Sequence, residues 1–336
     1  KRLIIRKINS NDPCIVVGTH ALLEDAIDLP KVGLCIIDEQ HRFGVLQRMK
    51  LLSKNKIHPH CLFMTATPIP RSYMLSCFGD LDKSIVDQLP PGRYPIKTYF
   101  VKKNNIDKVY QFCSRRLLLG EQVYMVYPLV EESEKIKVQS AVTAYQEIKE
   151  RFLGYCVELL HGRMSPDEKL TVMNRFKLGH CHILVSTTVI EVGIDVANAT
   201  VMIINHAERF GLSQLHQLRG RIGRGDKQST CFLVANPKTE SGNQRIQAML
   251  KTSNGFKIAE YDLKIRGPGD MLGTRQAGLP PFQVGDIVRD EKVMICAKES
   301  VDNLLKKDPN LTDPIHFGIS QRLHAKSALF STKTLN

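Results

Sequence analysis

The sequence predicts an α/β protein with mostly parallel sheets, followed by a mainly helical region. Short runs rich in β-branched residues recur up to residue 234, and all of them except Val157–Leu160, which contains Glu158, are apolar throughout rather than alternating. Longer polar or amphipathic stretches separate them, which is typical of parallel sheets covered by helices on both faces. The expected strands are Ile15–Val17, Leu34–Ile37, Cys61–Met64, Val123–Val126, Val157–Leu160, Ile183–Val185, Val201–Ile204 and Phe232–Val234.

One intervening helix has clear boundary signals. Ser165 is a helix N-cap residue, Pro166 suits the first helical position, and Glu168 completes a capping box. Leu170, Met173 and Phe176 then form an apolar stripe, and Gly179 ends the helix.

The composition favours a cytoplasmic protein with a polyanionic partner. The chain has 336 residues and a formal net charge of +13, which suits nucleic acid. No apolar run approaches the ~18 residues of a membrane span, so we expect no membrane contact. The nine cysteines contain no Cys-x-x-Cys spacing, and we expect those in or beside the strands, including Cys14, Cys181 and Cys231, to be buried reduced thiols. His180-Cys181-His182 is not expected to bind a metal, because neighbouring side chains of a strand point to opposite faces.

The Pro- and Gly-rich stretch Gln88–Pro95 is the strongest linker candidate. Beyond Pro237 the pattern changes to helix-like segments and the Gly/Pro-rich loop Arg266–Gly273. We therefore expect a first α/β unit over 1–90, a second over 91–240, a helical hairpin and loop over 241–290 and a basic helical tail over 291–336.

An acidic pair directly follows the expected strand Leu34–Ile37. Ligands bind at the carboxyl ends of strands in open α/β sheets. Asp38 could there hold Mg²⁺, while Glu39 orients or activates a water molecule. An Asp-Glu pair is also common on protein surfaces, so its position after a buried strand is what makes it informative.

Hydroxyl-bearing residues follow two other expected strands. Thr65-Ala-Thr67 comes after Cys61–Met64, where the hydroxyls could relay contacts between domains or cap the following helix. In the stretch Thr187–Asp195, Gly193 permits close approach and Asp195 could accept a ribose hydroxyl.

The run Gln217-Leu-Arg-Gly-Arg-Ile-Gly-Arg224 places Arg221 and Arg224 three residues apart between glycines. A guanidinium stays charged and its planar fork matches phosphate oxygens. The run therefore indicates a polyphosphate clamp, with a basic surface loop as the alternative. A dinucleotide-binding enzyme is excluded, since no Gly-x-Gly-x-x-Gly follows a strand.

The order of these motifs resembles that of superfamily-2 helicases, and the region Ile15–Phe282 resembles the RecG family of bacterial branch-migrating DNA helicases. Two RecA-like lobes, the first of them incomplete, and a translocation motif are then implied. The elements that carry the resemblance further are Gly18–Leu23, Thr65–Arg71, Gly79–Asp82, Leu89–Arg93, Pro128–Ser133 and His161–Met164. The transcription–repair coupling translocase is similar across both lobes, but it typically has Arg-Gly-Ala-Gly where this chain has Arg266–Gly269, and it lacks the Pro128–Ser133 element.

The resemblance implies ATP and Mg²⁺ as cofactors. Asp38 would then hold Mg²⁺, and Glu39 would orient or activate the hydrolytic water. Gln217, Arg221 and Arg224 would face the γ-phosphate, with Arg224 as the arginine finger. Gly193 and Asp195 would contact nucleotide or the lobe interface.

The resemblance also implies residues that couple ATP hydrolysis to DNA movement. His41, Thr65 and Thr67 would link nucleotide state to DNA. Arg245, Arg266 and Gln276 match the translocation motif, which spans Asn243–Phe282 here. The implied partner is branched double-stranded DNA, namely stalled forks and Holliday junctions, and the implied oligomeric state is a monomer.

Two features of the family are missing from the sequence: the Gly-x-x-x-x-Gly-Lys-Ser/Thr phosphate loop and the amino-terminal wedge domain. The chain begins without Met, and we expect it to be the C-terminal portion of a longer protein. We therefore expect no ATP hydrolysis or unwinding by these 336 residues alone, and residual salt-sensitive DNA binding. The alternative is a stand-alone basic DNA-binding or regulatory module without ATPase activity.

Overall fold

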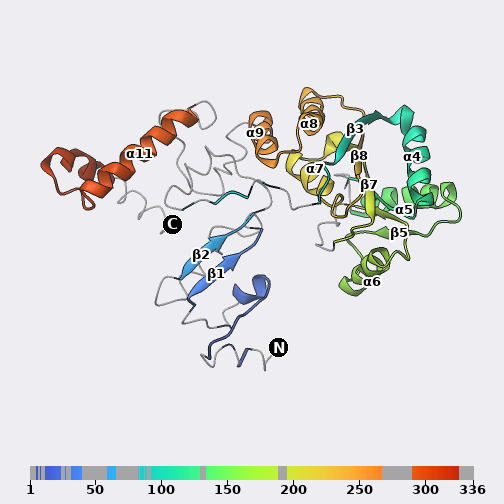
Figure 1. Ribbon diagram of the computed structural model, residues 1–336, viewed down its shortest axis with the longest axis horizontal. Helices are drawn as coiled ribbons and strands as arrows, with labels where there is room; N and C mark the ends of the chain where they lie inside the picture. Colours follow the sequence, from blue (N-terminus) through green and yellow to red (C-terminus); the bar gives the residue numbers. More distant parts are fainter. Residues whose placement is uncertain are drawn as a thin grey trace. The chain divides into compact units, whose positions relative to one another are not determined.

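The computed structural model divides into two compact units, Lys1–Pro68 with Leu272–Leu279, and Ile69–Met271 with Pro280–Asn336 (Figure 1). The structure describes residues 5–6, 8, 12–23, 27, 32–39, 59–65, 82, 84–86, 88, 92–128, 134–187, 195–266 and 290–324.

The first unit contains the parallel strand pair β1 (Leu34–Ile37) and β2 (His60–Phe63), with Leu34 opposite His60 and Ile37 opposite Phe63. A 3₁₀ helix, η1, covers His20–Leu23. Both strands lie where the sequence predicts them. The strand predicted at Ile15–Val17 is wrong. These residues form no strand, and Ile15 and Val17 are more than 90% exposed, so apolar character alone did not produce a strand.

The second unit contains a six-stranded sheet in the order β3-β8-β7-β4-β6-β5, in which every pairing is parallel. This confirms the expectation of parallel α/β architecture. Its strands are β3 (Lys97–Lys102), β4 (Gln122–Val126), β5 (Val157–Leu160), β6 (Ile183–Ser186), β7 (Ala199–Asn205) and β8 (Thr230–Ala235).

The strand β3 is absent from the sequence-based predictions. It lies at the edge of the sheet and pairs only with β8, and its exposed and half-buried residues alternate along most of its length. An edge strand with one face in solvent needs no continuous apolar run, so the criterion that identified the central strands does not apply to it.

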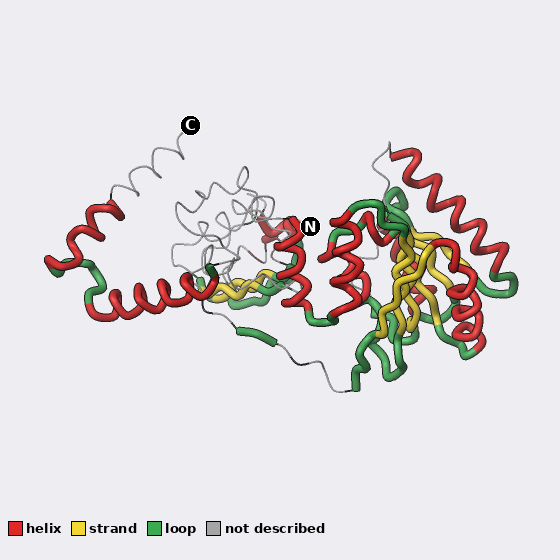
Figure 2. Tube along the Cα trace, turned by 90° about the horizontal axis from the view of Figure 1, so that it is seen from above, coloured by secondary structure: helices red, strands yellow, loops and turns green. Residues whose placement is uncertain are grey.

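Helices cover both faces of this sheet (Figure 2). One core contains inward residues such as Val123, Met125 and Ile203 with helices α4 and α5, and the other contains Tyr124, Met202 and Ile204 with α6 to α9. The alternation follows from the opposite directions of successive strand side chains. The helices are α4 (Ile106–Leu118), α5 (Glu134–Arg151), α6 (Pro166–Lys177), α7 (Leu212–Arg219), α8 (Glu240–Lys251) and α9 (Gly255–Arg266).

The predicted boundaries of α6 are confirmed. The Ser165 hydroxyl accepts from the Glu168 N–H at 3.2 Å, and the Glu168 carboxylate accepts from the Ser165 N–H at 2.7 Å. Met173 and Phe176 are buried, and Gly179 follows the helix with φ +80°. Leu170 is an error in the predicted stripe, because it is 53% exposed.

A further helix, α11 (Glu291–Lys307), is followed by a capped turn and the 3₁₀ helix η6 (Pro314–His316). The Asp308 carboxylate accepts from the backbone N–H groups of Thr312 and Asp313, both at 2.9 Å, and lies 2.8 Å from Nδ1 of His316. These hydrogen bonds, that of His316 first, lower the pKa of Asp308.

The described cysteines are free thiols. Cys181 and Cys231 are buried as expected, whereas the other cysteines expected to be buried are not: Cys35, Cys61 and Cys156 are half-buried. Cys14 is exposed, because its segment does not form the predicted strand. No helix among the described residues has the length and apolar character of a membrane span. The described residues also contain no group of three or more His, Cys, Asp or Glu side chains arranged to hold a metal ion.

Candidate nucleotide site

The acidic pair and Thr65 lie at one edge of the strand pair in the first unit. Because Ile37 is opposite Phe63 in a parallel pair, Asp38 and Thr65 leave the sheet at the same carboxyl edge. The Asp38 side chain accepts from the Glu39 N–H at 2.8 Å through Oδ1, and Asp38 is exposed while Glu39 is half-buried. Glu39 has φ 51°, in the left-handed region, so the chain turns sharply directly after the strand.

Several expected site residues lie outside the described part of the chain. These are His41, Thr67, Gly193 and Gln276. Of Arg266, the structure describes only the backbone, as the last residue of α9.

Arg221 and Arg224, in the second unit, lie on the loop between α7 and β8, at residues 220–229 (the arginine loop). Asp195 precedes β7, and β7 and β8 are adjacent parallel strands. Asp195 and the arginine loop therefore meet at the amino edge of the sheet. Nε of Arg224 lies 3.7 Å from Oδ1 of Asp195 and donates to the Gly220 carbonyl at 3.2 Å.

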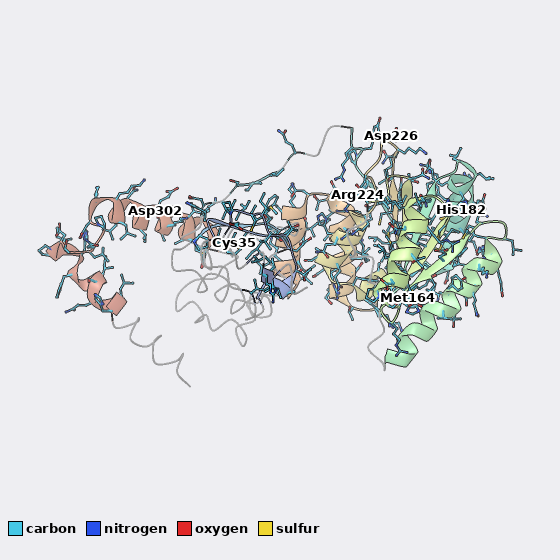
Figure 3. The ribbon with its side chains drawn as sticks, turned by 90° about the horizontal axis from the view of Figure 1, so that it is seen from below. Cys35, Met164, His182, Arg224, Asp226 and Asp302 are labelled. Atoms are coloured by element: carbon cyan, nitrogen blue, oxygen red, sulfur yellow. The ribbon has the colours of Figure 1, made fainter. Side chains whose placement is uncertain are left out.

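The sequence placed Thr187 and Asp195 in one stretch after a strand, but the structure separates them. Thr187 directly follows β6 at the carboxyl edge, where its N–H donates to the Leu160 carbonyl at 3.1 Å. Asp195 lies at the opposite, amino edge. Figure 3 shows the two edges, with Arg224, Asp226 and His182 towards one and Met164 towards the other.

The glycines of the arginine loop allow the chain to approach itself closely. A Cβ at Gly225 would lie 2.7 Å from the Ala197 carbonyl oxygen, and one at Gly223 would lie 2.9 Å from Cγ1 of Ile96. Gly223 also has φ +74°, which side chains disfavour. These contacts explain Gly223 and Gly225 by the packing of the loop itself.

Gln217 lies partly buried on α7, two residues before Arg219, which the sequence motifs do not point to. Arg219 is 3% exposed, and its Nη1 donates to the carbonyls of Met249 at 2.9 Å and Thr252 at 3.2 Å. Nη1 also lies 3.4 Å from the Thr98 hydroxyl. The end of α7 is thereby attached to the end of α8 and to β3. A charged residue in an otherwise buried helix stripe is the signal that could have revealed it.

Burial also alters the titration of nearby groups. Desolvation, followed by the charge of Arg219, lowers the pKa of His216 to about 4. Nδ1 of His216 lies 3.3 Å from Nη2 of Arg219, so the neutral imidazole can accept a hydrogen bond from the guanidinium. Burial raises the pKa of Tyr124, while the positive charges of Arg221 and Arg224 act in the opposite direction.

A polar hollow of ≈ 630 Å³ lies among α7, α8 and α9 and contains Arg245. Arg245 donates to the Phe210 carbonyl at 2.9 Å and the Ser241 carbonyl at 3.2 Å. The hydroxyl of Ser213 donates to Asp262, which is buried, at 3.3 Å. Arg245, on α8, therefore connects that helix to the residues just before α7. Arg219, at the other end of α7, makes a separate connection to the end of α8.

Three family models match successive parts of the chain. The model for the DEAD/DEAH box helicases matches residues 1–75, and that for the helicase conserved C-terminal domain matches residues 100–226. The model for domain 3, C-terminal, of the ATP-dependent DNA helicase RecG matches residues 252–329. The chain belongs to the RecG family. The last match also favours RecG over the transcription–repair coupling translocase.

Curated RecG helicases are similar over nearly the whole chain. The chain is 48% identical over 330 residues to RecG of Streptococcus pneumoniae, covering 98% of the chain and 49% of the relative. It is 46% identical over 315 residues to RecG of Bacillus subtilis, covering 94% of the chain and 46% of the relative. The chain thus spans about half the length of these relatives.

A solved structure of RecG bound to a three-way DNA junction matches with a TM-score of 0.65 and 42% identity, over 87% of the chain and 37% of that structure. This match confirms the RecA-like fold class expected from the motifs.

Proposed function

We propose that the chain forms part of an ATP-dependent double-stranded-DNA translocase that remodels branched DNA in recombination and repair. The observation that carries this proposal is the position of Arg224 beside Asp195, with Arg221 on the same loop, in a chain of the RecG family. Two guanidinium groups on one anchored loop suit the oxygens of a polyphosphate. In this proposal Arg224 is the arginine finger, and Gln217 and Asp195 contact the nucleotide.

The residues of the first unit fit Mg²⁺. Carboxylate oxygens are the ligands that Mg²⁺ prefers, and Asp38 presents an exposed carboxylate at the carboxyl end of β1. Bound Mg²⁺ would neutralise charge that develops on the phosphates. Glu39, next in sequence, would orient the attacking water or accept a proton from it. Thr65, at the end of the adjacent strand, would transmit the nucleotide state.

Branched DNA is the proposed partner. RecG in the similar solved structure is bound to a three-way junction, and the net charge of +13 suits a phosphate backbone. Arg245, together with Arg266 and Gln276, would convert nucleotide hydrolysis into DNA movement. We also propose that the protein is cytoplasmic and monomeric, and that its domain boundaries lie near residues 90, 240 and 290.

Activity is tested in a fusion in which this chain follows the amino-terminal half of Streptococcus pneumoniae RecG, which supplies the segment preceding the 49% of that relative matched here. We expect ATP hydrolysis that a three-way junction stimulates. A fusion that folds and binds the junction, but does not hydrolyse ATP, would instead support a DNA-binding module without ATPase activity.

A further inference from the structure

The arginine loop is attached to the segment that enters β3. Nε2 of Gln228 donates to the Pro95 carbonyl at 2.7 Å and also contacts the Ser229 carbonyl at 3.1 Å. Pro95 lies two residues before Lys97, where β3 begins. This hydrogen bond joins two segments that are far apart in the sequence.

A second contact joins the same two segments. A Cβ at Gly223 would lie 2.9 Å from Cγ1 and 3.2 Å from Cδ1 of Ile96, so the backbone of the loop rests directly on that side chain. Ile96 itself packs against the core beneath the sheet. Adjacent residues, Pro95 and Ile96, thus support the arginine loop on both sides of Arg224.

The far side of the loop is held by α4. Nη2 of Arg116 donates to the Gln228 carbonyl at 3.2 Å and lies 2.6 Å from the carboxylate of Glu121. That carboxylate is buried and also accepts a hydrogen bond from Thr200. The backbone also joins the two segments, because the Lys97 N–H donates to the Ser229 carbonyl at 3.1 Å. With the backbone of Gln228 held by α4, the side-chain amide of Gln228 adds the link from the loop to Pro95.

We propose that Gln228 is a positioning residue for Arg221 and Arg224. Through Pro95, it transmits the conformation of the segment entering β3 to the arginine loop. The inference rests on the proposed function of that loop and on the expected connection between the lobes at Gln88–Pro95. A change in that connection would then alter where the two guanidinium groups lie.

The test is amide hydrogen exchange in the 336-residue chain, read at Arg221 and Ile222. Their N–H groups donate to the carbonyls of Leu218 and Arg219 at 3.0 and 3.3 Å, so they report on the order of the loop. In Gln228→Met, which keeps the length of the side chain and removes its donor, we expect exchange about fivefold faster. Gln228→Lys retains a donor and should restore the rate to within about twofold of the wild type.

A matched control is Gln244→Met. Gln244 is an exposed glutamine whose amide donates to Glu240 at 3.2 Å on α8. Its replacement should leave exchange at the arginine loop unchanged. Wild-type exchange in Gln228→Met, or exchange in Gln228→Lys as fast as in Gln228→Met, would overturn the inference.

Transmission from the segment is tested by Pro95→Ala. This change keeps the acceptor carbonyl and every side chain of the loop but frees φ at residue 95. We expect exchange at Arg221 and Ile222 to rise at least about twofold, with the strand β4 unchanged. Unchanged exchange at the loop in Pro95→Ala would contradict the proposal. This result decides the matter even if Gln228→Met unfolds the lobe.

The exchange measurement requires no nucleotide and no hydrolysis. An inactive fusion with the expected exchange pattern would reject the proposed function and keep the link from Gln228 to Pro95. An active fusion with unchanged exchange would do the reverse.

Discussion

Nε of Arg224 lies 3.7 Å from Oδ1 of Asp195, across the amino ends of the neighbouring strands β7 and β8. The side chain of Arg224 is 25% exposed and that of Asp195 is 58% exposed. Ion pairs with this exposure contribute little to stability. The pair therefore does little to hold the lobe together, and in the proposed site its part is to orient the guanidinium.

The first prediction concerns this pair. Asp195→Ala should change the free energy of unfolding by less than about 1 kcal/mol, because solvent screens the charges. Urea unfolding followed by tyrosine fluorescence measures this, since the chain has no Trp and eight of its nine tyrosines lie between residues 94 and 261. A loss above about 2 kcal/mol would show that the pair is structural.

The second prediction concerns Arg219. Arg219→Met should destabilise the second unit by about 2–4 kcal/mol, because the carbonyls of Met249 and Thr252 lose their donor in a buried site. The same urea titration measures the change. Arg163→Ala, at an exposed arginine of this unit, is the control and should stay within about 0.5 kcal/mol of wild type. Equal effects in the two variants would reject a role for the buried network.

The third prediction concerns pH. The pKa of His216 is lowered to about 4 in the folded chain, against an unfolded value near 6.5. The unfolded state therefore binds the proton first as pH falls. The stability present above about pH 6.5 should be lost progressively down to about pH 4, with a loss of about 1–2 kcal/mol between pH 7 and pH 5.

His216→Gln removes the titrating group and should flatten this part of the pH profile. Urea midpoints at pH 7 and pH 5, compared between wild type and variant, give the difference directly. A variant that loses as much stability as the wild type over this interval would assign the pH dependence to other groups.

The fourth prediction concerns Glu39. The 336-residue chain should show no DNA-stimulated ATP hydrolysis, because its sequence contains no phosphate loop. In the fusion with the Streptococcus pneumoniae segment, Glu39→Gln should abolish hydrolysis while junction binding persists. Hydrolysis by the chain alone that Glu39→Gln removes would disprove the expectation for the isolated chain.

The central strands could be predicted from the sequence because each is apolar on both faces. Burial on both faces leaves a continuous pattern at Val123–Val126 and Ile183–Val185, and both predictions are confirmed. Elsewhere the criterion of a continuous apolar run both missed a strand and predicted one that does not form. It missed β3, which is half in solvent, and it produced a false strand at Ile15–Val17, where no described strand pairs with the segment.

The site could be predicted only in part. Motif order selected Arg221, Arg224 and Asp195 as candidates, and the structure brings Arg224 and Asp195 together. Motif order could not reveal that Asp195 lies at the edge opposite Thr187, since this depends on how β6 and β7 are joined. Arg219 and Gln228 were missed because their partners, Met249 and Pro95, are distant in the sequence. The roles assigned to all the candidate site residues stay predictions, and His41, Thr67, Gly193 and Gln276 also lie outside the described parts of the chain.

The most direct test of the proposed nucleotide site is the junction-stimulated ATPase rate of the fusion carrying Arg224→Lys. Lysine keeps the charge and lacks the planar fork, and an arginine finger contributes about 10³–10⁵ in rate where it has been measured in GTPases. The control is Arg175→Lys, at an exposed arginine of α6 that pairs with Glu158. We expect kcat to fall at least about 10²-fold in Arg224→Lys, with junction affinity unchanged and the control at the wild-type rate. A rate within about threefold of wild type in Arg224→Lys would contradict the assignment of Arg224 as the arginine finger.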